Sequence, residues 1–276
     1  MPMFTVDERC IRCGLCAELC VSHIIRLDNA NIPAVPEKME SMCIRCGQCV
    51  SFCPQSCCHL AFESEADRGP LDISLMPSAE AAEVLLRSRR SVRRYRETPV
   101  DAPTVRRIIE TARYAPSAAN SQPVRWTVTT TRERTREVAR LVVDHFRTER
   151  EANPDSPHAQ KLSFVISAWD AGDDIIFRTA PQIAVAIIGR DYFENYFRED
   201  AAMALTYFEL AAYANGLGCC WAGFFTIAAR ASERVARAVG AKEGEMVAGA
   251  QMFGYPQDLG TPRILPPRKP ADIDWL

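Results

Sequence analysis

The sequence predicts a two-domain protein, in which a small cysteine-rich module precedes a larger domain of helices and strands. The first observation is a cysteine pattern that occurs twice in the first 60 residues. The second is the length of 276 residues, enough for one very small domain and one of about 200 residues. The third is a series of helical and strand-like hydrophobic patterns after the cysteines. We therefore expect residues 1–60 to form the module, residues 61–78 a linker and residues 79–276 the larger domain.

The overall composition excludes several classes of partner. The chain has 33 basic and 35 acidic residues, so neither nucleic acid nor an anionic membrane is an expected partner. The most apolar stretch, residues 211–229, contains Asn215 and three glycines, and is expected to be a buried core segment. The first residues have neither a basic start nor an apolar run, so no signal peptide is expected. Without an export signal, the twelve cysteines are better explained as metal ligands than as disulfides, and a cytoplasmic location is expected.

The cysteine repeat is the most specific pattern in the chain. Residues 10–20 and 43–53 share the spacing C-x2-C-x2-C-x3-C with an offset of 33, and Pro54 follows the second copy. Three thiolates at every third residue can surround one corner of a cluster, while Gly14 and Gly47 allow a tight turn. Zinc bound by four cysteines is the alternative. It uses two C-x2-C pairs, however, whereas each copy here supplies three evenly spaced cysteines and a fourth.

The repeat resembles that of bacterial two-cluster ferredoxins, in which the fourth cysteine of each copy binds the other cluster. The resemblance implies two [4Fe–4S] clusters. The ligands of the first would be Cys10, Cys13, Cys16 and Cys53. Those of the second would be Cys43, Cys46, Cys49 and Cys20. Cys57 and Cys58 lie beyond the pattern and are interpreted as small buried residues.

The larger domain is expected to begin with two helices. The first starts near Ala79, after a Met-Pro-Ser turn, and ends in the basic stretch 89–95. The second covers residues 102–115, with Pro103 at an early helical position, and stops before Pro116. Both helices lead into segments rich in polar or small residues.

The remaining elements follow from their hydrophobic periods. Strands are expected at residues 125–131, 181–189 and 246–256. Polar and apolar residues alternate in the first of these segments, and the second is continuously apolar. The section 132–178 is expected to be helical, with a break at 153–157. Residues 192–217 are expected to form the longest helix; because its core is apolar nearly all round, it is suited to a subunit interface.

Five motifs of the larger domain occur together. They are Arg-Arg-Ser-Val-Arg at 89–93, Ala-Pro-Ser-Ala-Ala-Asn-Ser-Gln-Pro at 115–123, Gly-Leu-Gly-Cys-Cys-Trp-Ala-Gly at 216–223, Gly-Tyr-Pro at 254–256 and Pro-Pro-Arg-Lys-Pro at 266–270. In this order and spacing the domain resembles the nitroreductase family. The resemblance implies an α+β fold with a mixed, mainly antiparallel sheet flanked by helices. It also implies an intertwined homodimer with FMN at the interface.

The resemblance assigns the phosphate and polar edge of FMN to the basic stretch. The residues are Arg89, Arg90, Ser91 and Arg93. Guanidinium groups bind phosphate oxygens in bidentate fashion, and a serine hydroxyl adds a hydrogen bond. A solvated basic helix face is the alternative. By the same resemblance, Arg268 and Lys269 make a second phosphate contact.

Two loops would lie against the flavin ring. The first is contributed across the dimer and comprises Pro116, Ser117, Ala118, Asn120 and Gln122. The second comprises Trp221, Ala222 and Gly223, and the backbone of Ala222 and Gly223 would face flavin N5. A donor aimed at N5 stabilises the reduced flavin, so the chemistry belongs to FMN and no catalytic side chain is assigned. The adjacent Cys219 and Cys220 are interpreted as packing residues, because a bridge between neighbouring cysteines is strained.

Together the two halves predict an FMN-dependent oxidoreductase that receives electrons through the clusters and reduces a small acceptor such as a nitroaromatic or a quinone. The donor would be a low-potential carrier such as ferredoxin. In one alternative, NAD(P)H reduces the flavin directly and the clusters are an exit. In another, the protein is a non-catalytic electron carrier or redox sensor. Residues 144–178, with Phe164 and Trp169, stand where relatives build the substrate pocket, and a collapsed pocket there would favour the carrier.

Overall fold

A computed structural model describes residues 2–62, 69–192, 196–257 and 264–276. Its contacts divide the chain into two compact units. The first unit consists of Met1–Met76 together with Ala119–Ser121, and the second of Pro77–Ala118 together with Gln122–Leu276. Throughout the described residues, every helix is too short or too polar to cross a membrane.

The first unit is built from short elements around a small core. They are β1 (Phe4–Val6), α1 (Leu15–Glu18), β2 (Arg26–Leu27), β3 (Pro33–Ala34), the 3-10 helices η1 (Glu37–Met42) and η3 (Ile73–Leu75), α2 (Gln48–Ser51) and β4 (Cys58–Leu60). Strands β1 and β4 form one antiparallel pair, and β2 and β3 form another. The buried core residues are Phe4, Ile24, Ile25, Cys58 and Leu60.

The sequence repeat of the first unit is also a repeat of backbone conformation. Gly14 and Gly47 have φ angles of 75° and 72° and stand immediately before α1 and α2. Arg12 and Arg45, again 33 positions apart, have φ angles of 58° and 54°. A left-handed conformation costs a non-glycine residue free energy, so its occurrence at equivalent places indicates that the same turn is enforced in both copies.

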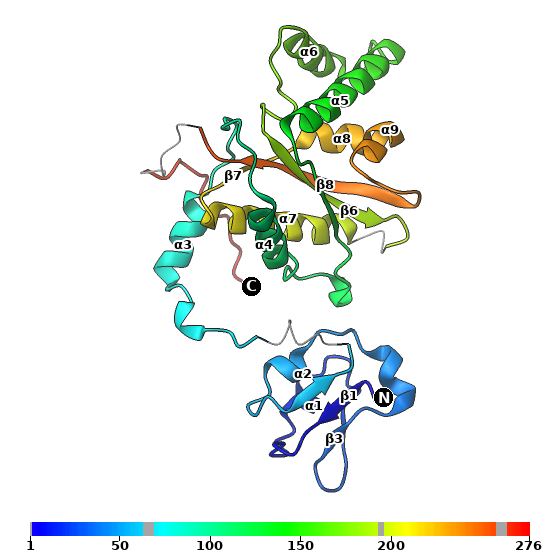
Figure 1. Ribbon diagram of the computed structural model, residues 1–276, viewed down its shortest axis with the longest axis vertical. Coiled ribbons are helices and arrows are strands. Elements are labelled where there is room, and N and C mark those ends of the chain that lie inside the picture. The colour runs from blue at the N-terminus through cyan, green and yellow to red at the C-terminus, as the bar shows by residue number, and fades with distance from the viewer. Residues whose placement is uncertain (1, 63–68, 193–195, 258–263) are drawn as a thin grey trace. The chain divides into compact units, whose positions relative to one another are not determined.

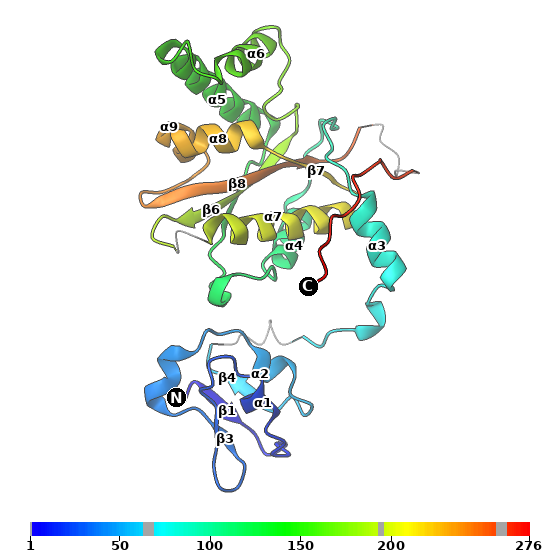
Figure 2. The same ribbon diagram turned by 180° about the vertical axis from the view of Figure 1, so that it is seen from behind.

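The second unit is a layered α+β structure. Its helices are α3 (Ala79–Ser88), α4 (Ala102–Ala112), α5 (Arg132–Ala152), α6 (Ala159–Asp170), α7 (Phe197–Ala214), α8 (Gly223–Ala231) and α9 (Glu233–Ala238). Its strands are β5 (Arg125–Val128), β6 (Gln182–Gly189), β7 (Gly218–Trp221) and β8 (Glu245–Gly254), in the sheet order β5-β6-β8-β7. Every neighbouring pair in this sheet is antiparallel. Figures 1 and 2 show α4 and α7 on one face of the sheet and α5, α8 and α9 on the other.

Polar side chains fix where several of these helices begin. The Ser78 hydroxyl accepts a hydrogen bond from the Ala81 N–H at the start of α3. Asp101 caps α4 in the same way, and Thr131 caps α5. Each of these caps satisfies a backbone N–H that lacks a partner inside its helix. The helix starts were therefore readable from local sequence.

Alternation along β6 divides the core between the two faces of the sheet. Ile183, Val185 and Ile187 belong to the core cluster that includes residues of α5, α8 and α9. Ala184 packs on the opposite face with α4 and α7, and Ala186 packs there with α7. Because successive strand residues point to opposite faces, a strand covered by helices on both sides reads as one continuous apolar run.

The structure confirms the expected α+β class, with its mainly antiparallel sheet and flanking helices. One expectation about an element was wrong, and one strand was missed. The longest described helix is α5 with 21 residues, whereas the helix within 192–217 is α7 with 18 residues. The missed strand is β7, which occupies residues 218–221 of the glycine-rich segment 216–223. The sequence signal failed there because pairing with β8, not local propensity, makes these residues a strand.

Gly218 in β7 permits a close approach of the chain that follows α3. A Cβ at this position would lie 2.5 Å from Cγ2 of Val92 and 2.6 Å from its Cβ. We therefore predict that Gly218→Ala lowers the free energy of unfolding by about 1–3 kcal/mol through overpacking. Urea titration followed by tryptophan fluorescence measures this, since all four tryptophans belong to the second unit.

Gly223→Ala provides the control for this measurement. Its new methyl group would lie 3.8 Å from Cδ1 of Trp221, an ordinary van der Waals contact, so the free energy of unfolding should change by less than about 0.5 kcal/mol. Equal stabilities of the two variants would show that the Val92 contact at Gly218 is not tight.

Candidate functional site

Two cavities of the first unit are lined by cysteines. The first has a volume of about 330 Å³. Its cysteines are Cys10, Cys13, Cys16, Cys53, Cys57 and Cys58. It thus brings together three cysteines of the first repeat with the fourth cysteine of the second.

The second cavity has the reciprocal composition. Its volume is about 410 Å³, and its cysteines are Cys43, Cys46, Cys49 and Cys20. Each cavity therefore contains the four thiols that the ferredoxin-like spacing groups together. Four thiols around an apolar hollow are a donor set that suits an iron–sulfur cluster.

The pKa of a thiol in the second cavity agrees with four cysteines that bind a cluster together. Burial, together with the nearby thiols of Cys46 and Cys43, raises the pKa of Cys49 to about 12. Four crowded thiols cannot all ionise unless positive charge compensates their repulsion. A cluster containing iron ions supplies that charge, so the residues fit the group.

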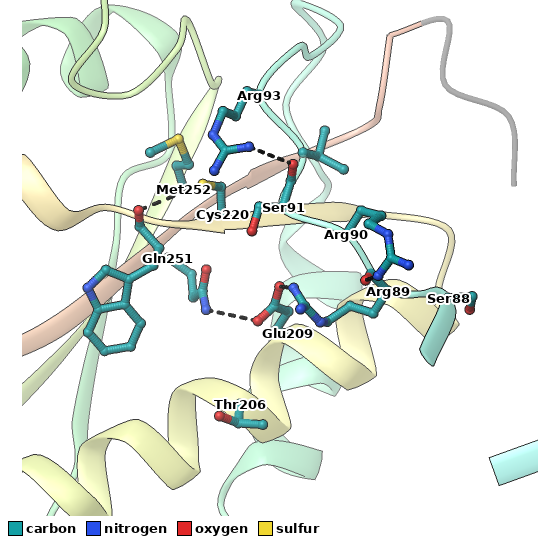
Figure 3. A network of polar contacts seen from close by, with 12 residues as sticks. Ser88, Arg89, Arg90, Ser91, Arg93, Thr206, Glu209, Cys220, Gln251 and Met252 are labelled. Carbon is teal, nitrogen blue, oxygen red and sulfur yellow. Dashed lines mark hydrogen bonds and ion pairs between the residues drawn. The ribbon is translucent and has the colours of Figure 1, made fainter. Parts of the chain in front are cut away.

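A second candidate site lies where the basic stretch leaves α3 and meets β7. The Val92 N–H donates to the Cys219 carbonyl oxygen at 2.8 Å, and Ser91 forms a parallel bridge with Cys219. Ser91 and Arg93 are exposed on either side of the buried Val92. Figure 3 shows the polar side chains of this stretch beside α7 and β7. The strand contact therefore fixes the backbone of the basic stretch and leaves its polar groups accessible.

Glu209 of α7 anchors this region. Its carboxylate accepts a hydrogen bond from Arg89 Nη1 at 2.7 Å and another from Gln251 Nε2 at 3.3 Å (Figure 3). Its side chain is only 14% exposed and that of Arg89 is 30% exposed, so the ion pair is partly shielded from water. The sequence analysis missed Glu209, although a single acidic residue within the apolar run 201–214 was an available signal.

Gln251 also carries an unsatisfied group. Its Oε1 atom is buried and has no hydrogen-bond partner among the described residues. Buried polar atoms are normally paired, and an exception indicates a partner such as water or a ligand. Basic side chains, a hydroxyl and an unpaired amide oxygen in one place suit a ligand with a phosphate and a polar edge.

The loop 116–123 is held in a strained conformation. Ala119, Asn120 and Gln122 have φ angles of 49°, 52° and 48°. Such angles are costly for residues other than glycine and are concentrated at functional sites. The Gln122 N–H donates to Ser117 Oγ at 3.0 Å, while Pro116 is exposed. This loop therefore has the constrained backbone that a ligand-contacting segment needs.

A buried carboxylate holds the start of this loop. Asp200 is 3% exposed, and its two oxygens accept from the Ala118 N–H at 3.2 and 3.1 Å. The Tyr192 hydroxyl donates to the same carboxylate. Asn120 is grouped with the first unit, where its side-chain amide donates to the carbonyl oxygens of Ile44 and Arg45. Sequence reasoning did not identify Asp200, because a long-range backbone contact leaves no local pattern.

The segment 221–223 presents backbone at the start of α8. The Ala222 N–H is bonded to the Ala250 carbonyl oxygen at 2.9 Å, and α8 begins at Gly223 without a side-chain cap. The Ala222 N–H is therefore not available to flavin N5, contrary to the expectation for this residue. The N–H groups of the first helical turn, from Gly223 onward, are available to an electron-rich atom of a ligand. Trp221 is 42% exposed beside them.

The other residues singled out from sequence lie elsewhere. Arg268 and Lys269 are exposed in the C-terminal segment, and Arg268 donates only to the carbonyl oxygen of Pro267 among the contacts of the described residues. Cys219 and Cys220 are both buried, in core clusters on opposite faces of the sheet. Their side chains therefore point apart, as adjacent strand residues do.

The region of α5 and α6 contains a further hollow. A cavity of about 670 Å³ is lined by Trp169 and Asp174, and by Arg136, whose guanidinium carbon lies 5.9 Å from the centre of a Trp169 ring. Phe164 is 65% exposed on α6. Within the segment 144–178, Trp169 and Asp174 therefore border a surface hollow, and Phe164 does not line it.

Comparison with known proteins supports the architecture of the second unit. The family model described as the nitroreductase family matches residues 86–255. A nitroreductase with bound FMN from Desulfitobacterium hafniense is 18% identical, with a TM-score of 0.55 over 69% of this chain and 96% of that one. One from Bacteroides fragilis, also with FMN, is 21% identical, with a TM-score of 0.53 over 69% and 95%. A BluB-like flavoprotein from Clostridium difficile is 21% identical, with a TM-score of 0.54 over 68% and 94%.

The Arg89–Glu209 pair leads to a stability prediction. Glu209→Leu leaves Arg89 and the Gln251 amide without their partner in a partly buried place. The free energy of unfolding should fall by about 1–3 kcal/mol. Denaturant titration of the flavin-free protein, followed by tryptophan fluorescence, measures this fall.

Glu83→Leu is the matched control. Glu83 pairs with Arg87 on α3, but these side chains are 66% and 60% exposed, so the loss should stay below about 1 kcal/mol. If Glu209→Leu costs no more than Glu83→Leu, Glu209 does not anchor this region.

Proposed function

Because this chain belongs to the nitroreductase family, we propose that it is an FMN-dependent oxidoreductase that takes electrons through two [4Fe–4S] clusters and reduces a small organic acceptor. The observation that carries the proposal is the pair of cavities in which the two cysteine repeats exchange their fourth thiols. When bound, the clusters would transfer single electrons, and FMN would accept electrons singly or in pairs and deliver a hydride equivalent. An acceptor such as a nitroaromatic or a quinone fits this chemistry.

We propose that the basic stretch holds FMN. Arg89, Arg90, Ser91 and Arg93 supply donors for the phosphate and the polar edge. Glu209 fixes Arg89 in place, so less conformational entropy is lost when a phosphate binds. The unpaired Oε1 of Gln251 could accept a hydrogen bond from the ligand. The FMN-bound structures from Desulfitobacterium hafniense and Bacteroides fragilis agree with this cofactor.

We propose that the ring of FMN is contacted by two backbone segments. The N–H groups at the start of α8, from Gly223 onward, would face N5 and stabilise negative charge there. The loop with Pro116, Ser117, Ala118, Asn120 and Gln122 would come from the partner subunit of a homodimer. The half-exposed apolar side chains of α7, such as Met203 and Leu210, support such an interface. Arg268 and Lys269 remain proposed phosphate contacts.

The thiol-rich first unit favours the cytoplasm as the compartment, because reducing conditions keep cysteines available for metal. The donor would be a low-potential carrier such as ferredoxin. The open cavity beside Trp169 favours an enzyme over a non-catalytic carrier, because a carrier needs no hollow in that segment.

The FMN site predicts a selective loss of affinity. Arg89→Ala should weaken FMN binding by about ten- to a hundredfold, because one charge-assisted hydrogen bond contributes about 1.5–3 kcal/mol. Titration of the flavin-free protein with FMN, followed by quenching of flavin fluorescence, gives the Kd. Arg87→Ala is the control, since Arg87 is an exposed arginine two residues before Arg89, in the last turn of α3, and pairs with Glu83. If the two variants bind FMN with equal affinity, Arg89 is not part of the FMN site.

The electron route predicts a selective loss of reduction. In protein prepared without oxygen, reduced ferredoxin should bleach the FMN absorbance, and the combined change of Cys43, Cys46 and Cys49 to Ser should abolish this bleaching. Photochemical reduction of FMN in the same variant should be unchanged, which shows that the flavin is intact. Undiminished bleaching by ferredoxin would contradict the route through the clusters. Rapid bleaching by NADH or NADPH would instead make the nucleotide the direct donor.

A further inference from the structure

The two cysteine cavities are not equivalent. The first is lined by six cysteines and the second by four. The extra two are Cys57 and Cys58, both 2% exposed. With the repeat offset of 33, their counterparts are Ile24 and Ile25, which line the second cavity.

Packing alone does not account for the extra thiols. Ile24 and Ile25 are buried to nearly the same degree, with 2% and 5% exposure. The equivalent core positions of the fold therefore accept an ordinary aliphatic side chain. A thiol at both places in only one copy adds chemistry that the core does not require.

The sulfur of Cys57 lies next to an expected ligand. Cys53 Sγ and Cys57 Sγ are 3.5 Å apart. The sulfur atoms of Cys53, Cys57 and Cys58 all lie within 4.8 Å of one another. The Ser56 N–H closes a turn onto the Cys53 carbonyl oxygen, and Cys57 follows this turn just before β4. A small adjustment of a turn residue could therefore carry the Cys57 sulfur to the place of Cys53.

We propose that Cys57 is a reserve ligand for the first cluster, an inference that rests on the proposed presence of the clusters. If the thiolate of Cys53 were protonated and released from its iron, or absent through mutation, the Cys57 thiol would give its proton to solvent and its thiolate would take the place of Cys53 on that iron. The number of thiolate ligands and the charge of the centre are then unchanged. The second cavity has no such spare thiol among its lining residues. The two clusters should therefore differ in their tolerance to loss of the crossing cysteine.

The two copies of the repeat provide a matched experiment. Full-length protein is prepared without oxygen, and iron and sulfide are measured together with the electron paramagnetic resonance of the reduced clusters. The natural sequence should hold about eight iron atoms per chain. Cys53→Ser should keep about the same amount, whereas Cys20→Ser, the equivalent change in the other copy, should retain about half.

Two double variants identify the replacement thiol. Cys53→Ser with Cys57→Ser should fall to about half of the natural iron content, like Cys20→Ser. Cys53→Ser with Cys58→Ser should keep the full content. If Cys53→Ser alone falls to half, or if only the variant lacking Cys58 falls, the assignment of Cys57 is wrong. If the natural sequence itself binds no iron and sulfide, the proposed cluster function is what fails.

A transplanted thiol tests the inference even if Cys53→Ser does not fold. Ile24 occupies the position equivalent to Cys57 and lines the second cavity. Adding Ile24→Cys to Cys20→Ser should therefore restore the iron content from about half to about the full amount. If the iron content does not recover, the inference that a thiol at this position reaches the cluster is wrong.

Discussion

The pairing of β6 with β8 is the interaction on which the second unit depends. These antiparallel strands run from Gln182 opposite Phe253 to Gly189 opposite Glu245, with one shift of register between Ala186 and Ile187. A slip of one residue would turn every side chain to the other face of the sheet. Gln251 would then leave the face of α7, and its contact with Glu209 would be lost. The register of the central strands thus positions the anchor of the basic stretch.

Close packing at glycine connects the same sheet to the candidate FMN site. Gly218 leaves room for Val92, and Gly249 lies against the side chains of Trp221 and Leu205, where an added Cβ would be 2.7 Å from either. The contact at Gly218 positions Val92, in the chain after α3, and the contact at Gly249 positions the indole ring of Trp221. The site is therefore built from close backbone packing and a partly buried ion pair, while its exposed polar groups are accessible to a ligand.

In the first unit, the corresponding constraint is the exchange of the fourth cysteine between the repeats. Each short helix, α1 and α2, ends next to a cysteine that belongs to the other cavity. Neither cavity has four thiols unless both copies fold together. The similar φ angles of Gly14 and Gly47, 75° and 72°, show how closely the copies match. Cys57 and Ile24 therefore occupy equivalent places in two copies of similar backbone and differ only in the chemistry of their side chains.

The sequence by itself determined what depends on local pattern. The cysteine spacing grouped the thiols, the Met-Pro-Ser turn and Pro103 indicated two helix starts, and apolar runs located β6 and β8, because each signal is confined to neighbouring residues. Only the tertiary structure decided that β7 is a strand, that Glu209 binds Arg89 and that Asp200 holds Ala118. Each of these depends on a partner far away in the chain, and no local propensity specifies which distant group will lie within hydrogen-bond distance.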